Sequence, residues 1–291
     1  MFDLFLSNSD LQNSKACGIA MSVHGQAKKV TTHTLQEMKR AGEKITMLTA
    51  YDYSLAKLVD NGGVDVILVG DSASNVMAGQ VTTVPMTLDH MIYHAQCVKR
   101  AVDRALIVVD MPFGTYQGNS AIALESAIRI MKEAEGHAVK LEGGAEIVES
   151  IKRILTAGIP VMGHLGLTPQ SIYKFGTYTV RAKEDGEAAK LIEDAGAFSI
   201  ILECMTSSAA KFITKKLKIP TIGIGSSSNC DGQILVTDDM LGISGFYPKF
   251  VKKYTNLNRI IEKAIKKYTR EVKQKKFPKL TNFLDGRKNR K

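Results

Sequence analysis

Residues 65–72 read Asp-Val-Ile-Leu-Val-Gly-Asp-Ser, a short apolar run that stops at a glycine and two polar side chains. A continuous apolar run is typical of a strand that is buried on both faces, as in a parallel sheet. The pattern recurs and predicts eight strands, at residues 45–50, 65–69, 106–109, 138–141, 160–163, 198–202, 220–224 and 233–236. Helical patterns separate most of them, most clearly at residues 88–100, 120–135, 146–156 and 207–217.

The alternation of eight strands with helices predicts an α/β fold, the (β/α)8 TIM barrel, with a doubly wound open sheet as the alternative. Nearly every predicted strand ends at a polar residue: Asp52, Asp71, Asp110, Glu142, His164, Glu203 and Asp238. In a barrel these ends converge on one rim, where active sites lie, whereas an open sheet spreads them along an edge. We therefore favour the barrel.

Two local patterns refine this expectation. Asp52 and Asp238 each precede a helical pattern closely, so we interpret them as helix N-caps. Leu124, Ile128 and Met131 have the spacing of a buried helical stripe.

Three of the strand ends suggest a metal site. Asp71 and Ser72 follow the second strand, Asp110 follows the third, and Lys140 and Glu142 end the fourth. Alternation along a strand sends Lys140 and Glu142 to the same side. Carboxylates without a Cys/His cluster favour a hard cation, Mg²⁺ before Zn²⁺. The alternative is a set of helix caps beside a Lys140–Glu142 ion pair.

Two further strand ends could take part in chemistry. His164 could polarise a substrate or satisfy a hydrogen bond in the core, and its position does not decide between them. Glu203 ends an apolar run and could act as a general base.

The net charge of the chain has an uneven distribution. Of 291 residues, 39 are Lys or Arg and 29 are Asp or Glu, which gives +10. Residues 249–291 alone hold 16 basic and 3 acidic residues, so the rest of the chain is slightly acidic. This argues against a nucleic-acid-binding body.

The basic region contains an apolar stripe formed by Leu257, Ile260, Ile261, Ala264 and Ile265. The stripe predicts an amphipathic helix that packs on the barrel or on a neighbouring subunit. A basic helix that binds nucleic acid or a membrane surface is the alternative.

The expected organisation is one domain. We expect a disordered N-terminal extension at 1–20 (with Met21 an alternative start), a barrel with its C-terminal helix at 21–280, and a basic disordered tail at 281–291. No apolar run reaches the roughly 20 residues that span a bilayer, and four scattered cysteines fit a reducing compartment. We expect a cytoplasmic protein that binds neither membrane nor nucleic acid.

Taken in order, the strand-end motifs resemble the ketopantoate hydroxymethyltransferase family from about residue 34 to residue 253. The matching segments are Thr49-Ala-Tyr-Asp-Tyr-Ser54, Gly70-Asp-Ser72, Asp110-Met-Pro-Phe113, Lys140-Leu-Glu-Gly-Gly144, Gly163 to Gln170, Leu202-Glu-Cys204 and Asp231-Gly-Gln-Ile-Leu235. Each segment is a weak signal, but the ordered set is specific.

The resemblance implies a barrel of the phosphoenolpyruvate/pyruvate-binding type that assembles into a homo-oligomer, a decamer. It implies hydroxymethyl transfer from 5,10-methylenetetrahydrofolate to 3-methyl-2-oxobutanoate, giving ketopantoate for pantothenate and coenzyme A synthesis, through an enolate that Mg²⁺ stabilises. The implied metal ligands are Asp71, Asp110 and Glu142. The same two aspartates with Ser72, Lys140 and His164 would contact substrate, and Glu203 would be the base.

The sequence also departs from the family pattern. The stretch 182–197 is about two helical turns shorter, which could shift Glu203, and Ser227 replaces a glycine, which would strain a positive φ. Ala73-Ser74 and Asp238 replace the family's usual residues. Another Mg²⁺-dependent 2-oxoacid lyase or mutase on this barrel, a decayed homologue, and a non-enzymatic binding protein are the competing hypotheses.

Overall fold

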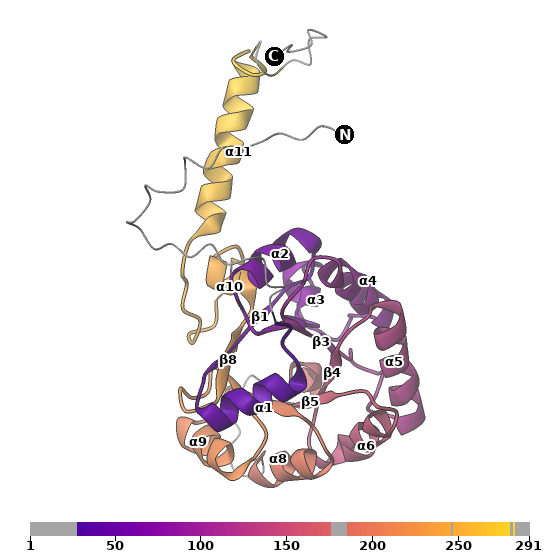
Figure 1. Ribbon diagram of the computed structural model, residues 1–291. Helices are drawn as coiled ribbons and strands as arrows, with labels where there is room; N and C mark the ends of the chain where they lie inside the picture. Colours follow the sequence, from indigo (N-terminus) through magenta and orange to yellow (C-terminus); the bar gives the residue numbers. More distant parts are fainter. Residues whose placement is uncertain (1–27, 176–184, 246, 280–281, 283–291) are drawn as a thin grey trace, which may run out of the picture.

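The computed structural model describes residues 28–175, 185–245, 247–279 and 282. Eight parallel strands pair in chain order and close into a barrel, so the predicted fold is confirmed (Figure 1). The strands are β1 (Ile45–Thr49), β2 (Val66–Val69), β3 (Leu106–Asp110), β4 (Ala138–Glu142), β5 (Val161–Gly166), β6 (Ser199–Glu203), β7 (Thr221–Ile224) and β8 (Gly232–Leu235). The expectations for the ends, 1–20 and 281–291, concern residues outside the described ranges, apart from Asn282.

Most of the helices surround this barrel, while the first crosses one end of it and the last projects away (Figure 1). They are α1 (Thr32–Ala41), α2 (Tyr53–Asn61), α3 (Ala73–Val76), α4 (Leu88–Lys99), α5 (Ser120–Glu133), α6 (Val148–Thr156), α7 (Ile172–Phe175), α8 (Asp185–Asp194), α9 (Ser207–Lys216), α10 (Thr237–Leu241) and α11 (Leu257–Lys273), with 3₁₀ turns η1 (Ala145–Ile147) and η2 (Pro169–Ser171).

Strand alternation divides the apolar residues into an inner and an outer core. In β2, Val66 and Leu68 belong to the inner cluster, while Ile67 and Val69 belong to the outer cluster beneath the helices. The inner cluster also contains Leu35 of α1, which crosses one end of the barrel (Figure 1). Because one face of β2 points inward and the other points to the helices, both are apolar, and this strand shows no polar alternation.

The same alternation carries polar side chains into the barrel at the other end. In β3 the inner positions run from Leu106 and Val108 to Asp110, and in β4 they run from Ala138 to Lys140 and Glu142. The strand ends that the sequence singled out therefore form the last inward-facing layer of side chains, as in other barrels of this kind.

The predicted apolar stripe of α5 is wrong. Leu124 and Met131 are half-buried and Ile128 is 38% exposed, while the buried face contains Ala123, Ser126, Ala127 and Ile130. Small side chains let the helix lie close to the strands, so the face with alanine and serine is the one that packs.

Of the two predicted caps, one is correct. The Asp52 side chain accepts a hydrogen bond from the Leu55 backbone N–H and caps α2. Asp238 lies inside the first turn of α10, whose N-cap is Val236. Asp238 is buried, and its Oδ2 has no hydrogen-bond partner among the described residues. Burial raises the pKa of this carboxyl, with the negative charges of Asp239 and Asp52 adding to the effect.

The C-terminal helix does not pack on the barrel. Figure 1 shows α11, in yellow, projecting away from it. None of its residues, all of which are described, is buried, and Ile260, Ile261 and Ile265 are 57%, 44% and 58% exposed. The first of the two expected packing surfaces is therefore wrong for this chain alone. Within the described ranges, no helix is long and apolar enough to cross a membrane.

Two departures from the family pattern lie wholly or partly among the described residues. Ser227 is not among the described residues with positive φ, so the expected strain does not arise; the left-handed position is Gly225, at φ +58°. The shortened stretch 182–197 lies outside the described residues at 182–184. In its described part, helix α8 packs Ile192 against Gly163 of β5.

Candidate active site

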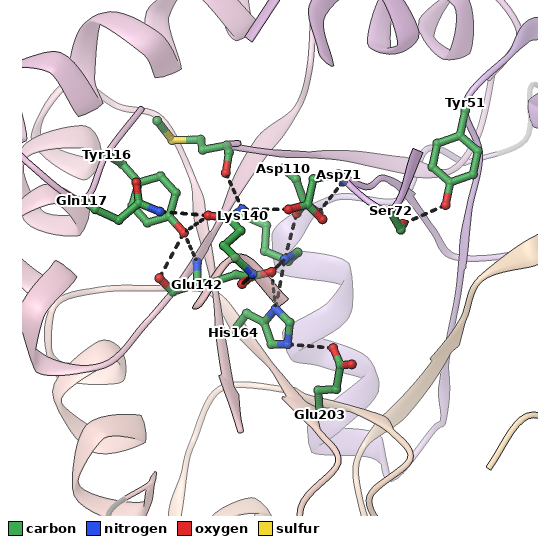
Figure 2. Close-up of polar contacts among 12 residues, drawn as sticks. Tyr51, Asp71, Ser72, Asp110, Tyr116, Gln117, Lys140, Glu142, His164 and Glu203 are labelled. Carbon is green, nitrogen blue, oxygen red and sulfur yellow. Dashed lines mark hydrogen bonds and ion pairs between the residues drawn. The ribbon is translucent and has the colours of Figure 1, made fainter. Parts of the chain in front are cut away.

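Charged side chains gather where the inner strand faces end at the barrel mouth (Figure 2). Their exposed fractions are 2–5%, which is far below the usual exposure of charged residues: Asp71 4%, Asp110 2%, Lys140 3%, Glu142 5% and His164 3%. Charges buried this deeply are stable only when they are paired or bind an ion.

Lys140 is at the centre of the cluster. Its Nζ lies 2.9 Å from Asp110 Oδ1, 3.7 Å from Glu142 Oε1 and 3.1 Å from His164 Nδ1. The register explains this, because Asp110 pairs with Lys140 between β3 and β4, and Glu142 pairs with His164 between β4 and β5. The prediction that Lys140 and Glu142 lie on the same side of β4 is confirmed.

His164 connects the cluster to Glu203. Nδ1 lies 3.4 Å from Glu142 Oε1, and Nε2 lies 3.1 Å from Glu203 Oε2. Glu203 is the more exposed end of this series, with 16% of its side chain accessible. Its position at the end of β6 is held closely, because its carbonyl oxygen would be only 2.1 Å from a Cβ at Gly166.

The two aspartates meet at the other side of the cluster. The Asp71 backbone N–H donates to Asp110 Oδ2 at 3.0 Å, and Asp71 Oδ2 accepts from Gln170 Nε2 at 2.9 Å. Next to Asp71, the Ser72 hydroxyl lies 2.8 Å from the hydroxyl of the buried Tyr51. Every predicted site residue is thus part of one connected region.

The cluster changes the protonation of its members. Burial, together with the charges of Glu142 and Asp110, raises the pKa of Asp71 to about 8. Burial also raises the pKa of Asp110, against the opposing effect of Lys140. Burial and Lys140 disfavour charge on His164, but the carboxylates of Glu142 and Glu203 outweigh both and raise its pKa to about 9.

This donor set fits a hard divalent cation. Burial raises the pKa of both aspartates, and the charges of Glu142 and Asp110 raise that of Asp71 further, so a cation bound between Asp71 and Asp110 would stabilise their ionised forms. Among the described residues, no group of three or more His, Cys, Asp or Glu encloses a metal by itself. That is compatible with Mg²⁺, because Mg²⁺ retains waters and substrate oxygens beside one or two carboxylates.

The cavity over this cluster has both polar and apolar lining. Its polar lining includes Asp71, Ser72, Asp110, Lys140, Glu142 and His164, and its apolar lining includes Leu68, Ile201, Ile224, Ile234 and Val236. A ligand that contacts both kinds of side chain carries oxygen atoms and an aliphatic group.

Gln170, Tyr116 and Tyr51 also support the site, and the sequence assigned a role to none of them. Gln170 ends the Gly163–Gln170 motif, 99 positions from its partner Asp71. Only the closed barrel brings these residues together, so no local spacing could have revealed the contact.

The fold and the site define the class of protein: a (β/α)8-barrel enzyme with buried carboxylates at the mouth of the barrel that fit a divalent cation. Similar barrels occur in phosphonopyruvate hydrolase, solved with oxalate and Mg²⁺ (TM-score 0.58, 13% identity, 87% of this chain and 93% of that one), and in 2,3-dimethylmalate lyase (TM-score 0.56, 15% identity, 87% and 91%). At this identity they show the fold alone; the lyase is a member of the phosphoenolpyruvate mutase/isocitrate lyase superfamily.

Comparison of sequences assigns the chain to a family. The profile of the ketopantoate hydroxymethyltransferase family matches residues 29–280, so the chain belongs to that family. The 3-methyl-2-oxobutanoate hydroxymethyltransferases of Cytophaga hutchinsonii and Parabacteroides distasonis are 63% and 62% identical over 258 residues, which is 86% of this chain and 95% and 94% of theirs. The predicted resemblance is confirmed, and with it the class of hydroxymethyltransferase.

Proposed function

We propose that this protein transfers a hydroxymethyl group from 5,10-methylenetetrahydrofolate to 3-methyl-2-oxobutanoate, giving ketopantoate for pantothenate and coenzyme A synthesis. The observation that carries the proposal is that one cavity is lined by both buried charged side chains and aliphatic side chains. A branched 2-oxoacid carries groups of both kinds, its carboxylate and ketone oxygens and its isopropyl group. The names of the relatives support the same substrate.

Lys140 and Ser72 hold the oxygen-bearing end of the substrate in this proposal. Burial opposes the charge of Lys140, but the neighbouring carboxylates of Asp110 and Glu142 outweigh it and raise the pKa of the Lys140 ammonium. The side chain therefore stays charged at neutral pH. A fixed ammonium stabilises negative charge that develops on a nearby oxygen, and the effect is strong in a site without water. Ile201, Ile224 and Val236 receive the isopropyl group.

Asp71 and Asp110 hold Mg²⁺ in this proposal, and Glu142 reaches it directly or through a water molecule. When bound, the ion would act as a Lewis acid on the substrate oxygens, an effect of several kcal/mol in other enzymes. The two aspartates are already adjacent, through the hydrogen bond from the Asp71 N–H to Asp110.

Glu203 is the general base of the proposal. It removes the proton from C3 of the 2-oxoacid, and the carbanion formed there bonds to the methylene carbon of the folate. Both bonds from that carbon to N5 and N10 break, and one water supplies the hydroxyl oxygen of ketopantoate. Tetrahydrofolate leaves with a proton on each of these two nitrogens, and the proton from C3 and those of the water supply them and the new hydroxyl. His164, 3.1 Å from Glu203, orients the carboxylate.

A direct assay tests this function. The purified, Mg²⁺-loaded protein is incubated with 3-methyl-2-oxobutanoate and methylenetetrahydrofolate, and ketopantoate formation is followed by mass spectrometry. We expect turnover that needs both substrates and stops when EDTA removes the metal. A folded, metal-loaded protein without turnover would contradict the proposal.

The lyase or mutase alternative is less well supported. Such an enzyme would use a reactive cysteine, and the cysteine nearest the site is Cys204. Burial, with the charge of Glu203, raises the pKa of this thiol to about 11, so it stays protonated and unreactive at neutral pH. The decayed-homologue alternative predicts a broken site, whereas all predicted residues are present and connected here.

We also propose that the chain is a homo-oligomer, with a decamer as the expected size, and that α11 supplies part of the interface. Among the described residues, nothing buries its exposed apolar stripe (Ile260, Ile261, Ile265, Tyr268 and Val272). On this view α11 still belongs to the single 21–280 domain. Ile261→Lys with Ile265→Lys should lower the mass measured by light scattering, while Lys263→Ala on the polar face should not.

We propose a cytoplasmic location, with small molecules and copies of itself as partners rather than nucleic acid or membrane. Cys97, Cys204 and Cys230, the cysteines within the described ranges, are free thiols, as a reducing compartment favours. Binding of the intact protein to DNA or to anionic vesicles at physiological salt would contradict this proposal.

A further inference from the structure

Gln170 forms hydrogen bonds with two members of the carboxylate cluster, although the proposed function gives it no role. It lies in the 3₁₀ turn η2 after β5 and is 3% exposed. Its side chain donates from Nε2 to Asp71 Oδ2 at 2.9 Å and to the Met111 carbonyl at 2.9 Å. Its backbone N–H donates to Glu142 Oε2 at 3.0 Å. One residue therefore contacts two carboxylates that come from different strands.

The orientation of the Gln170 amide is fixed by its neighbours. Nε2 faces two acceptors, while Oε1 accepts from the Tyr116 hydroxyl at 2.7 Å and from Gln117 Nε2 at 2.9 Å. Turning the amide over would place its oxygen against Asp71 and its NH₂ against Gln117 Nε2. The wrong orientation would therefore lose the hydrogen bonds to the Met111 carbonyl and from Gln117 Nε2, and would set the amide oxygen against Asp71 Oδ2.

Tyr116 extends the same network to the backbone of Glu142. Its hydroxyl accepts from the Glu142 N–H at 3.0 Å, and its single proton has its shortest acceptor in Gln170 Oε1. Tyr116 is 1% exposed, so water does not replace these contacts. Glu142 is thus held at its backbone by Tyr116 and at its carboxylate by Gln170.

We infer that Gln170, oriented by Tyr116, is the positioning residue that fixes the Asp71 and Glu142 carboxylates for the divalent cation. The inference rests on the metal site of the proposed function and adds residues that act through its ligands. Partners that orient metal ligands in this way change metal affinity by about 10–100-fold when they are removed. Gln170 touches neither the cation nor the substrate in this assignment.

The test is direct cation binding to the protein without substrate, followed by the paramagnetic resonance signal of free Mn²⁺. Gln170→Met keeps the approximate volume and removes the amide, so we expect the Mn²⁺ dissociation constant to rise about 10–100-fold. Tyr116→Phe should raise it less. The double variant should equal Gln170→Met alone, because both changes break one network.

Gln96→Met is the matched control. Gln96 also donates from Nε2 to a backbone carbonyl, that of Glu133, but on the outer helices. It should leave Mn²⁺ affinity unchanged, and thermal melts show which variants are folded. A purely structural role for Gln170 would lower the melting temperature and leave affinity intact.

The outcomes separate the two claims. If wild-type protein binds Mn²⁺ and folded Gln170→Met binds it equally well, the inference is overturned while the metal site stands. If Gln170→Met does not fold, unchanged affinity in Tyr116→Phe overturns it. If wild-type protein binds no Mn²⁺, the metal site of the proposed function fails, and the inference fails with it.

Discussion

The barrel mouth and helix α11 are both rich in charge, but their charges have opposite surroundings. At the mouth, Lys140 and its carboxylate partner Asp110 each have 3% of the side chain exposed. On α11, the Lys266–Glu262 pair spans 3.2 Å with 78% and 58% exposed. A buried charge interacts strongly with its neighbours, whereas an exposed one is screened by water and salt. The comparison teaches that chemistry follows the burial of charges rather than their number.

The largest expected effect is at the open end of the buried network. Glu203→Gln keeps the shape of the side chain but cannot accept a proton, and a positioned general base contributes about 10²–10⁴-fold. We expect turnover, and deuterium exchange from solvent at C3 of the 2-oxoacid, to fall by that factor while substrate binding persists. Glu125→Gln on the exposed face of α5 is the control. Normal exchange in Glu203→Gln would place the base elsewhere.

Removing the ammonium group of Lys140 should lower the free energy of unfolding more than any of the other substitutions. Lys140→Met leaves Asp110 and Glu142 as buried carboxylates without their ammonium partner. Loss of one member of a buried pair typically destabilises by about 3–5 kcal/mol. Urea unfolding at neutral pH measures the effect. A change below about 1 kcal/mol would mean that the mouth is hydrated and its charges behave like those of α11.

The metal-free mouth should also make stability depend on pH. The pKa of Asp71 is raised to about 8 from an ordinary 3.8, so between these values the folded state keeps a proton that the unfolded state has lost. Stability attributable to this group therefore falls as pH rises through that window. Asp71→Asn has no such proton, so at pH 8 it should exceed EDTA-treated wild type by about 1–3 kcal/mol.

The measurement is urea unfolding of both proteins, treated with EDTA, at pH 5 and at pH 8. The advantage of Asp71→Asn should grow between the two values, and Mg²⁺ should stabilise only the wild type at pH 8. If the free energies of unfolding of the two proteins change with pH in parallel, Asp71 is not the group whose raised pKa makes the metal-free protein less stable at high pH.

The smallest effect is expected on α11. Lys266→Met is the same substitution as at Lys140, but on an exposed helix face. Surface changes of this kind usually stay within about 0.5 kcal/mol. Urea unfolding under the same conditions as for Lys140→Met provides the comparison. An equally large loss would mean that the polar face of α11 is covered in the assembled protein.

The sequence predicted the strands well because a strand buried on both faces must be apolar throughout. Val66–Val69 is such a segment, and Ala138–Glu142 is one apart from the inward-facing Lys140 and Glu142; each was located to within one residue. The α5 stripe failed because large apolar residues do not have to face the core when small ones allow closer packing. Asp238 failed as a cap because α10 already begins at Thr237, so that Val236 occupies the N-cap position.

Local sequence alone determined the inward-facing end of each strand, because side chains alternate with a fixed period of two. That fixed Asp110, Lys140, Glu142, His164 and Glu203 as candidates, each within its own segment. Tertiary structure decided which of them touch, since contact depends on the register between strands and on closure of the barrel. Only the tertiary structure brings Gln170 to Asp71, 99 positions away in the sequence. Only the tertiary structure shows that no residue of α11 is buried by the described part of the chain.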